Sequence, residues 1–475
     1  MFSTRLLQLS IGRDAGASLQ RQLHNHIRRL ILSGELQARE RLPSSRALAK
    51  DLEIARITVT EVYDQLSAEG YIETKTGAGT FVADFVPDHL GTMQTDDIEV
   101  DSPAERQTSA PISSGMPALE AFPKDKWART AGRVARKLST GEMVHADPRG
   151  YLPLRSEIAQ HLRLARNVVC SPDQVMIISG LQQGLFVLAN SILAANSTII
   201  LEDPGYDGLL AAARASNSSI GFTAVDEAGA LPPEQDQGLL VVSPSRQYPL
   251  GLTMPHGRRM ELLAWARTNN SFILEDDYDS EFRYSGRPLN SLQGIAGGER
   301  VIYGGTFSKS IFPALRLGYL VLPDSLVDQV VKFREAIDSY PSITNQLLLH
   351  DFMASGEFQR HIRRLRKIHA ERKELFDQGA HKHLAEWLSF LPSDAGLHCT
   401  AWLNETALAL NLKDHDMAEY AQAYGIGAVS VSRCYQHAPA RQGLLIGFAN
   451  LQPAEIEPAI QQLAARIRQE TGFSS

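Results

Sequence analysis

The chain has 475 residues, of which 43% are hydrophobic and 21% are charged, and it carries a formal net charge of −7. This length exceeds one ordinary domain, and the composition is that of a soluble globular protein, so two or three packed domains are expected. The negative net charge argues against a protein that coats nucleic acid along its whole surface.

No apolar run approaches the ~18 residues that a membrane-spanning helix needs. The first residues, MFSTRLLQLSIGRDAG, hold one short apolar patch without a small-residue cleavage site, so no signal peptide is predicted. The three cysteines, Cys170, Cys399 and Cys434, are far apart and form no C-x-x-C pair, which favours reduced thiols over disulfides. We therefore expect a cytoplasmic protein without a metal site.

The first 85 residues predict three helices. The segment Ser18 to Leu36 starts with a serine cap, reaches a helix-ending glycine at Gly34, and spaces its apolar residues as a helix does: Leu19, Leu23, Ile27, Leu30 and Ile31. Pro43 and Ser44 start a second helix. The stretch ITVTEVYDQLSAEGY predicts a third, which ends at Gly70.

The next stretch, YIETKTGAGTFV, alternates about a turn of Gly77, Ala78 and Gly79, as is typical of a β-hairpin. Three helices and a hairpin predict a winged helix-turn-helix over residues 1–85, a module that binds double-stranded DNA. A structural cap on the large domain is the alternative. It is weakened by the candidates for phosphate and base contacts on the second helix, the third helix and the wing: Ser44, Arg46, Arg56, Thr58, Thr60, Lys75, Gly77 and Gly79.

Residues 86–111 are polar and acidic and lack apolar periodicity, as expected of a flexible linker. From residue 112 to residue 475, apolar runs such as QVMIISG, STIILEDP, GLLVVSPS, SFILEDDY and RVIYGGT alternate with helical stretches. This order predicts an α/β domain with a mostly parallel sheet. Ligands of such sheets gather at the strand ends, so the residues after each run are the candidates for a site.

The stretch TFSKSIFPALRLGY, residues 306–319, places Lys309 among apolar neighbours. A lysine on an exposed turn is the commoner interpretation of such a residue. However, the hydroxyls of Thr306 and Ser308 and the guanidinium of Arg316 suit a phosphate, and a desolvated amine is a usable nucleophile toward a carbonyl. Together they favour pyridoxal 5'-phosphate, held as a Schiff base by the lysine and in need of a carboxylate near its ring nitrogen.

The run SFIL is followed by EDDYDSEF, which supplies that carboxylate as Asp276. Tyr278, two residues later, offers a phenol to the ring oxygen of the cofactor. A Mg²⁺ site or a helix cap is the alternative for this acidic cluster.

Three further strand ends add weaker signals. Gly180, Leu181 and Gln182 open a helix whose free N–H groups suit a phosphate, although an ordinary glycine turn has the same pattern. Tyr206 in DPGY and Tyr248 in SPSRQYPLG place aromatic rings where they can stack on a cofactor.

A family resemblance runs through these motifs. From about Ile112 onward the chain resembles a fold-type I aminotransferase, and the whole chain resembles the MocR/GabR-type subfamily of GntR-like transcriptional regulators. The motifs that carry the resemblance are LPSSRALA, ITVTEVYDQLSAEGY, GAGTFV, HADPRGYLPLR, SGLQQGL, EDPGY, SPSRQYPLG, EDDYDSEFRY and SKSIFPALRLGY. The implied fold is a winged helix-turn-helix plus a large pyridoxal-phosphate-dependent transferase domain with a small C-terminal α/β subdomain.

The resemblance also implies roles for single residues. Lys309 matches the Schiff-base lysine, Asp276 the partner of the pyridinium nitrogen, and Tyr278 the hydrogen-bond donor to the ring hydroxyl. Tyr206 matches the aromatic ring that stacks on the cofactor. The implied phosphate seat consists of Thr306, Ser308, Arg316, Leu181 and Gln182. Such proteins form head-to-tail, domain-swapped homodimers whose two DNA-binding heads bind repeated half-sites in a promoter.

Two positions depart from the family pattern. Leu445, in LLIGFA, stands where related transaminases carry the arginine that grips the substrate carboxylate, and Arg433 or Arg441 is the possible substitute. His145, in HADPRG, stands where many relatives carry a tyrosine that reaches the phosphate in the neighbouring subunit. A histidine there still hydrogen-bonds, so His145 remains a candidate for the cofactor site.

The leading hypothesis is therefore a pyridoxal-phosphate-dependent transcriptional regulator that senses the cofactor, or a small amine or amino acid, through an aldimine at Lys309. An active aminotransferase with a DNA-binding appendage is the alternative, and Leu445 speaks against it. A repressor whose large domain only dimerises is the third hypothesis, and the presence of Lys309, Asp276 and Arg316 speaks against that one.

Overall fold

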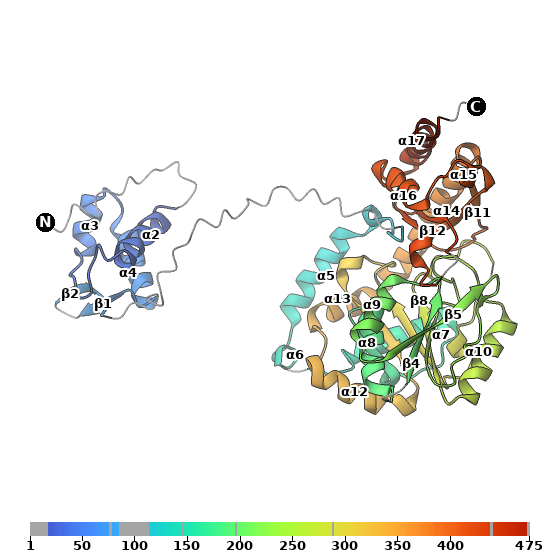
Figure 1. Ribbon diagram of the computed structural model, residues 1–475. Coiled ribbons are helices and arrows are strands. Elements are labelled where there is room, and N and C mark those ends of the chain that lie inside the picture. Colours follow the sequence, from blue (N-terminus) through green and yellow to red (C-terminus); the bar gives the residue numbers. More distant parts are fainter. Residues whose placement is uncertain are drawn as a thin grey trace. The chain divides into compact units, whose positions relative to one another are not determined.

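The computed structural model divides the chain into two compact units, residues 1–107 and 108–475 (Figure 1). It describes residues 18–75, 78–84, 114–144, 146–194, 197–286, 289–437 and 440–472. The expected linker, residues 86–111, lies outside the described residues, as do Gly77 and His145.

The first unit begins with the three expected helices, which are α2 (Leu19–Leu32), α3 (Ser45–Asp51) and α4 (Arg56–Ala68). The side chain of Ser18 caps α2 by accepting a hydrogen bond from the backbone N–H of Arg21 at 3.3 Å, and Ser44 caps α3 in the same way. The apolar face of each helix turns inward, and the three faces form one small core that includes Leu23, Ile27, Leu48, Val59, Val62 and Leu66.

The helices are followed by the expected hairpin, strands β1 (Ile72–Lys75) and β2 (Gly79–Val82). The two strands pair antiparallel from Ile72 opposite Val82 to Lys75 opposite Gly79. Three helices and a two-stranded wing are the elements of a winged helix-turn-helix, so the predicted fold class of this unit is confirmed.

The second unit is built on an eight-stranded sheet with the order β3-β10-β9-β8-β7-β4-β5-β6. Strands β9, β8, β7, β4 and β5 are parallel, whereas β10 and β6 are antiparallel to their neighbours. The bounds are β3 Val175–Ile178, β4 Thr198–Asp203, β5 Ser219–Asp226, β6 Gly229–Ala230, β7 Gly238–Val242, β8 Phe272–Asp277, β9 Val301–Thr306 and β10 Gly318–Val321.

Helices cover both faces of this sheet (Figure 1). In β7, for example, Leu239 and Val241 face the core shared with α8 (Leu181–Ile192), α9 (Asp207–Ala215) and α12 (Asp324–Asp338). Leu240 and Val242 face the opposite core, which α10 (His256–Thr268) and α11 (Leu292–Ile295) cover. A strand buried on both faces reads as the continuous apolar run seen in the sequence.

A smaller four-stranded antiparallel sheet has the order β11-β12-β14-β13. Its strands are β11 (Leu388–Phe390), β12 (His398–Leu403), β13 (Ala428–Ser430) and β14 (Gly443–Gly447). Its core is continuous with that of the large sheet. The other helices and single turns of this unit are α5 Lys124–Lys137, α6 Thr140–Val144, α7 Leu152–Arg166, α13 Ile343–Ala354, α14 Glu357–His383, α15 Glu405–Ala409, α16 Asp414–Ala423, α17 Pro453–Thr471, η1 Leu119–Ala121, η2 Pro172–Gln174, η3 Pro313–Leu315 and η4 Ser432–Cys434.

None of the described helices is both long enough and apolar enough to cross a membrane. The three cysteines are buried as free thiols.

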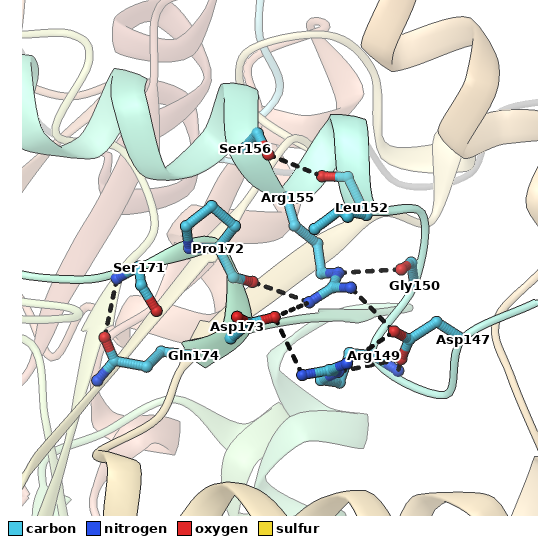
Figure 2. Close-up of polar contacts among 10 residues, drawn as sticks. All are labelled: Asp147, Arg149, Gly150, Leu152, Arg155, Ser156, Ser171, Pro172, Asp173 and Gln174. Atoms are coloured by element: carbon cyan, nitrogen blue, oxygen red, sulfur yellow. Dashed lines mark hydrogen bonds and ion pairs between the residues drawn. The ribbon is translucent and has the colours of Figure 1, made fainter.

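Residues of the segment HADPRGYLPLR form a network of charges around the buried Arg155 (Figure 2). The guanidinium of Arg155, 1% exposed, donates to the carbonyls of Gly150 at 3.0 Å and Pro172 at 2.9 Å, and to the carboxylate of Asp147 at 2.9 Å. Gly150 has a φ of +98°, and a Cβ there would lie 2.5 Å from Ile177, so only glycine fits the turn. This network fixes the start of α7 against β3.

We expect the substitution Arg155→Ala to lower the free energy of unfolding of the second unit by about 3 kcal/mol, because two carbonyls and a carboxylate lose a buried partner. The matched control is Arg149→Ala, whose half-exposed guanidinium also binds Asp147 and should cost less than about 1 kcal/mol. Denaturant unfolding followed by tryptophan fluorescence measures both. Equal losses in the two variants would contradict the assignment.

Candidate functional site

One cavity of about 260 Å³ in the second unit gathers the predicted residues of the cofactor site. It lies at the carboxyl ends of β8 and β9, where Asp276 and Thr306 stand. Of the predicted residues, it is lined by Gly180, Leu181, Gln182, Tyr206, Tyr248, Asp276, Tyr278, Thr306, Ser308, Lys309 and Arg316. The lining also includes residues that the sequence analysis did not single out, namely Ser114, Gly115, Asp279, Gly305, Pro313, Leu397 and His398.

The acidic residues at the end of β8 point to different surroundings because side chains alternate along a strand. Glu275 points away from the cavity and caps α11, where its carboxylate accepts from the N–H groups of Leu292 and Gln293, both at 2.9 Å. Asp277 pairs with the buried Arg166 at 2.8 Å. Among the described residues no group of three or more metal-ligating side chains comes together, so the magnesium alternative gains no support from the geometry.

Asp276 is the carboxyl of this cluster that faces the cavity without a hydrogen-bond partner among the described residues. Burial raises its pKa well above the ordinary value, and the neighbouring Asp277 and Glu202 raise it further. Such a carboxyl ionises when a cation comes within a few ångströms. A protonated ring nitrogen is a cation of that kind.

Lys309 follows β9, and its amine lies inside the cavity. Its Nζ donates a hydrogen bond to the carbonyl of Gly115 at 2.8 Å. A Cβ at residue 115 would lie 2.7 Å from that nitrogen, so glycine is needed for the approach. Burial lowers the pKa of Lys309 below its ordinary 10.5, although Asp279 and Asp276 act in the opposite direction. A larger fraction of the amine is therefore unprotonated at neutral pH.

The candidate phosphate seat combines three kinds of donor. The helix α8 starts right after Gly180 without a side-chain cap, which leaves the N–H groups of its first turn available to an anion. The guanidinium of Arg316 stands beside this helix start, since a Cβ on Gly180 would lie 3.1 Å from its Nη2. Thr306 and Ser308 add hydroxyl groups, and the hydroxyl of Thr306 accepts from the N–H of Ser308 at 3.1 Å.

Three tyrosines form the aromatic part of the lining. The rings of Tyr206 and Tyr248 meet edge to face at 5.3 Å, and Tyr206 is 45% exposed. The hydroxyl of Tyr278 is buried and has no hydrogen-bond partner among the described residues. An unpartnered phenol costs free energy, so its position indicates that a ligand supplies the acceptor.

Arg246 and His398 form a buried polar pair that the sequence analysis missed. Arg246 is 4% exposed and His398 is 2% exposed. The guanidinium contacts Nε2 of His398 at 2.6 Å and the carboxylate of Asp279 at 3.1 Å. Because 152 positions separate Arg246 from His398, no local sequence pattern predicts that the two residues meet.

The two arginines expected to replace the missing carboxylate clamp do not line this cavity. Arg433 is bound to Asp207 at 3.0 Å, and Arg441 lies over the ring of Trp402 at 4.0 Å. Leu445 is fully buried in β14, opposite Thr400 and Val429.

In the first unit, Arg46, Arg56 and Lys75 are exposed on α3, α4 and β1, and Thr58 and Thr60 are partly exposed on α4. Two of the predicted DNA contacts have internal partners. The hydroxyl of Ser44 accepts from the N–H of Ala47 at 3.2 Å, and that of Thr60 donates to the carbonyl of Arg56 at 3.0 Å. Gly79 adjoins Arg41, an exposed cation that was not predicted.

Comparison with known families agrees with this division. Residues 19–82 match the family of bacterial regulatory proteins, gntR family, and residues 117–463 match aminotransferase class I and II. The chain is 34% identical to the probable rhizopine catabolism regulatory protein MocR of Rhizobium meliloti, over 96% of this chain and 95% of that protein. It is 31% identical to the HTH-type pyridoxine biosynthesis transcriptional regulator PdxR of Corynebacterium glutamicum, over 94% and 95% of the two chains.

Solved structures show the same fold for the second unit. The kynurenine aminotransferase of Pyrococcus horikoshii matches with a TM-score of 0.67 at 23% identity, over 75% of this chain and 90% of that one. The α-aminoadipate aminotransferase LysN of Thermus thermophilus, complexed with N-(5'-phosphopyridoxyl)-L-leucine, matches with a TM-score of 0.66 at 24% identity, over 76% and 92%. The predicted fold-type I architecture is confirmed.

The chain belongs to the MocR-type regulators, in which a gntR-family winged helix-turn-helix is fused to an aminotransferase class I and II domain. It is therefore a DNA-binding transcriptional regulator.

We expect Arg56→Ala, at the start of α4, to weaken binding to an operator by about 1–3 kcal/mol, or roughly 5- to 150-fold, because this side chain lies where a recognition helix meets base edges. Arg363→Ala, which removes an exposed arginine from α14, is the control and should leave affinity unchanged. Fluorescence anisotropy with DNA from upstream of its own gene measures both. Unchanged affinity in the Arg56 variant would exclude this residue from the interface.

Proposed function

We propose that this regulator binds pyridoxal 5'-phosphate at Lys309 and uses it to sense a small amine, whose binding changes how the DNA-binding heads engage a promoter. The observation that carries the proposal is the composition of one cavity. It brings a desolvated amine, Lys309, together with a partly buried carboxyl without a hydrogen-bond partner among the described residues, Asp276, and a seat of phosphate donors.

The residues present fit the cofactor. The seat made by Thr306, Ser308, Arg316 and the start of α8 suits its phosphate, since hydroxyls, a guanidinium and helix N–H groups are the usual donors. Asp276 would face the ring nitrogen, which resolves the unfavourable burial of a carboxyl without a partner. The unpartnered hydroxyl of Tyr278 would donate to the ring oxygen, and Tyr206 would cover one face of the ring.

When bound, pyridoxal phosphate supplies a carbonyl group that condenses with a primary amine, with loss of water, and an electron-withdrawing ring. Lys309 provides that amine in its unprotonated form, because burial disfavours the ammonium. Asp276 would hold a proton on the ring nitrogen, and the N–H groups at the start of α8 would keep the phosphate in place. These roles need no fast turnover, and Leu445 removes the carboxylate clamp on which transamination of ordinary amino acids depends.

We further propose that the protein responds to its ligand as a homodimer. Winged helices recognise repeated half-sites as pairs, and a homodimer in which each head serves the partner subunit presents two of them. A ligand shifts such a dimer between two arrangements only if it binds one arrangement more tightly than the other.

The test of the cofactor assignment is optical. The wild-type protein incubated with pyridoxal phosphate and freed of excess reagent should show a band near ~420 nm, and borohydride reduction should fix the cofactor mass to the chain. Lys309→Ala should lack both signals, whereas Lys367→Ala, which removes an exposed lysine of α14, should keep them. A colourless wild-type protein would contradict the proposal. Rapid turnover of an amino donor, with kcat in the range ~1–10³ s⁻¹, would instead favour an aminotransferase.

The lowered pKa of Lys309 predicts a particular pH dependence. The uptake rate of pyridoxal phosphate should rise with pH as the amine loses its proton and should level off below pH 10.5, the ordinary lysine value. Stopped-flow absorbance between pH 6 and pH 10 records the rate. A rate that keeps rising about tenfold per pH unit up to 10 would mean that the amine is not desolvated.

A further inference from the structure

The charges of the Lys309 cavity limit the ligand that shares it with the cofactor. Its lining contains two cations, Lys309 and Arg316, and two carboxyls, Asp276 and Asp279. Arg316 belongs to the phosphate seat, and Lys309 would be bound to the carbonyl of the cofactor until an incoming primary amine takes its place and releases it. The other two charged groups of the lining are the carboxyls, and Asp279 is paired with Arg246, which is not a lining residue. Of the described lining residues, none offers a further positive charge to a ligand.

The position that holds a carboxylate in related transaminases is apolar here. Leu445 is fully buried between Thr400 and Val429 of the neighbouring strands. Arg433 and Arg441 are engaged with Asp207 and Trp402. A carboxylate in this cavity would therefore lose its water without gaining a dedicated arginine from the described residues of this subunit, which is costly.

His398 offers a neutral donor instead. A guanidinium has only donors, so its contact at 2.6 Å makes Nε2 of His398 the acceptor and places the ring proton on Nδ1. That Nδ1–H is buried and has no hydrogen-bond partner among the described residues. Since buried donors are nearly always satisfied, an unpartnered one in the wall of a ligand cavity indicates a missing acceptor.

Arg246 fixes this arrangement. Besides Nε2 it also binds the backbone carbonyl of His398. Gly396 has a φ of +83°, and a Cβ there would lie 2.3 Å from the guanidinium, so the turn that leads into β12 closes directly on Arg246. Arg246 is thus a positioning residue that sets the tautomer and the orientation of His398.

We propose that the ligand sensed here is a primary amine whose remaining polar groups are uncharged, such as an amino alcohol, and that the Nδ1–H of His398 donates to its hydroxyl or carbonyl oxygen. This assignment rests on the proposed function, since it names the class of amine that the Lys309 cavity accepts. Ser114 and Tyr248, which are not assigned to the cofactor under the proposed function, add a neutral hydroxyl and a tyrosine side chain to the ligand side. The cavity volume of about 260 Å³ lies below the usual range for drug-sized ligands, so the amine must be small.

The experiment titrates the cofactor-loaded, full-length protein with matched pairs in which an uncharged hydroxymethyl group replaces the carboxylate: L-alaninol against L-alanine, and serinol against L-serine. Changes in the cofactor absorbance band give the Kd of each compound. We expect each amino alcohol to bind at least tenfold more tightly than its amino acid. Equal or tighter binding of the amino acids to a coloured protein would overturn this inference alone. A protein that takes up no pyridoxal phosphate would overturn the proposed function as well.

Two variants test the role of His398. His398→Phe keeps a ring of similar size without the donor and should reduce the amino alcohol preference to less than threefold, while His398→Gln retains an N–H donor and should keep part of it. The readout is the ratio of the two Kd values, which a purely structural role would not change. The unliganded cofactor band shows that each variant is folded, and His415→Phe, at an exposed site on α16, is the control. An unchanged ratio in the phenylalanine variant would exclude the proposed hydrogen bond.

Discussion

The large unit depends on how it distributes buried charge at the carboxyl ends of β8 and β9. Four acidic residues lie within five positions, and burying a carboxylate without a partner is costly. The strand alternation sends Glu275 to the N–H groups of α11 and Asp277 to Arg166, and the following turn sends Asp279 to Arg246. Asp276 alone among these four has no hydrogen-bond partner among the described residues, and it lines the cavity. The fold thus satisfies three of the carboxyls internally and keeps the fourth for a ligand.

Much of this organisation was predictable from the sequence because it follows from local rules. The three helices of the first unit have their serine caps and glycine ends in the chain itself, and the wing is signalled by alternation about a glycine turn. The strands of the large sheet are continuous apolar runs because helices cover both faces. Since ligands of parallel sheets gather at strand ends, the residues that follow those runs were the right place to search, and eleven of them line one cavity.

The remaining features depend on contacts that the sequence does not announce. Arg246 and His398 meet across 152 positions, and Gly115 reaches Lys309 across 194. The side chains of Ser44 and Thr60 suit DNA contacts by type, yet the backbone of their own helices engages them. Arg433 and Arg441 were plausible clamps by proximity in sequence to Leu445, but an ion pair and an aromatic ring hold them elsewhere. Ser44 and Thr60 thus have partners within their own helices, whereas tertiary partners hold Arg246, His398, Lys309 and the two arginines.

The contact between Lys309 and Gly115 has a consequence for signalling. Gly115 comes shortly after the segment that joins the two units, and its carbonyl binds the same nitrogen that a carbonyl compound would take. The backbone carbonyl accepts a proton of the amine, whereas condensation with a small carbonyl compound would remove the protons of the neutral amine as water, so the two bonds exclude each other. Because the two bonds exclude each other, uptake of the small molecule by Lys309 and the position of residue 115 are coupled: a change in the free energy of one changes the free energy of the other. Under the proposed function, residue 115 near the start of the second unit is itself a hydrogen-bond partner of the nitrogen that takes up the cofactor.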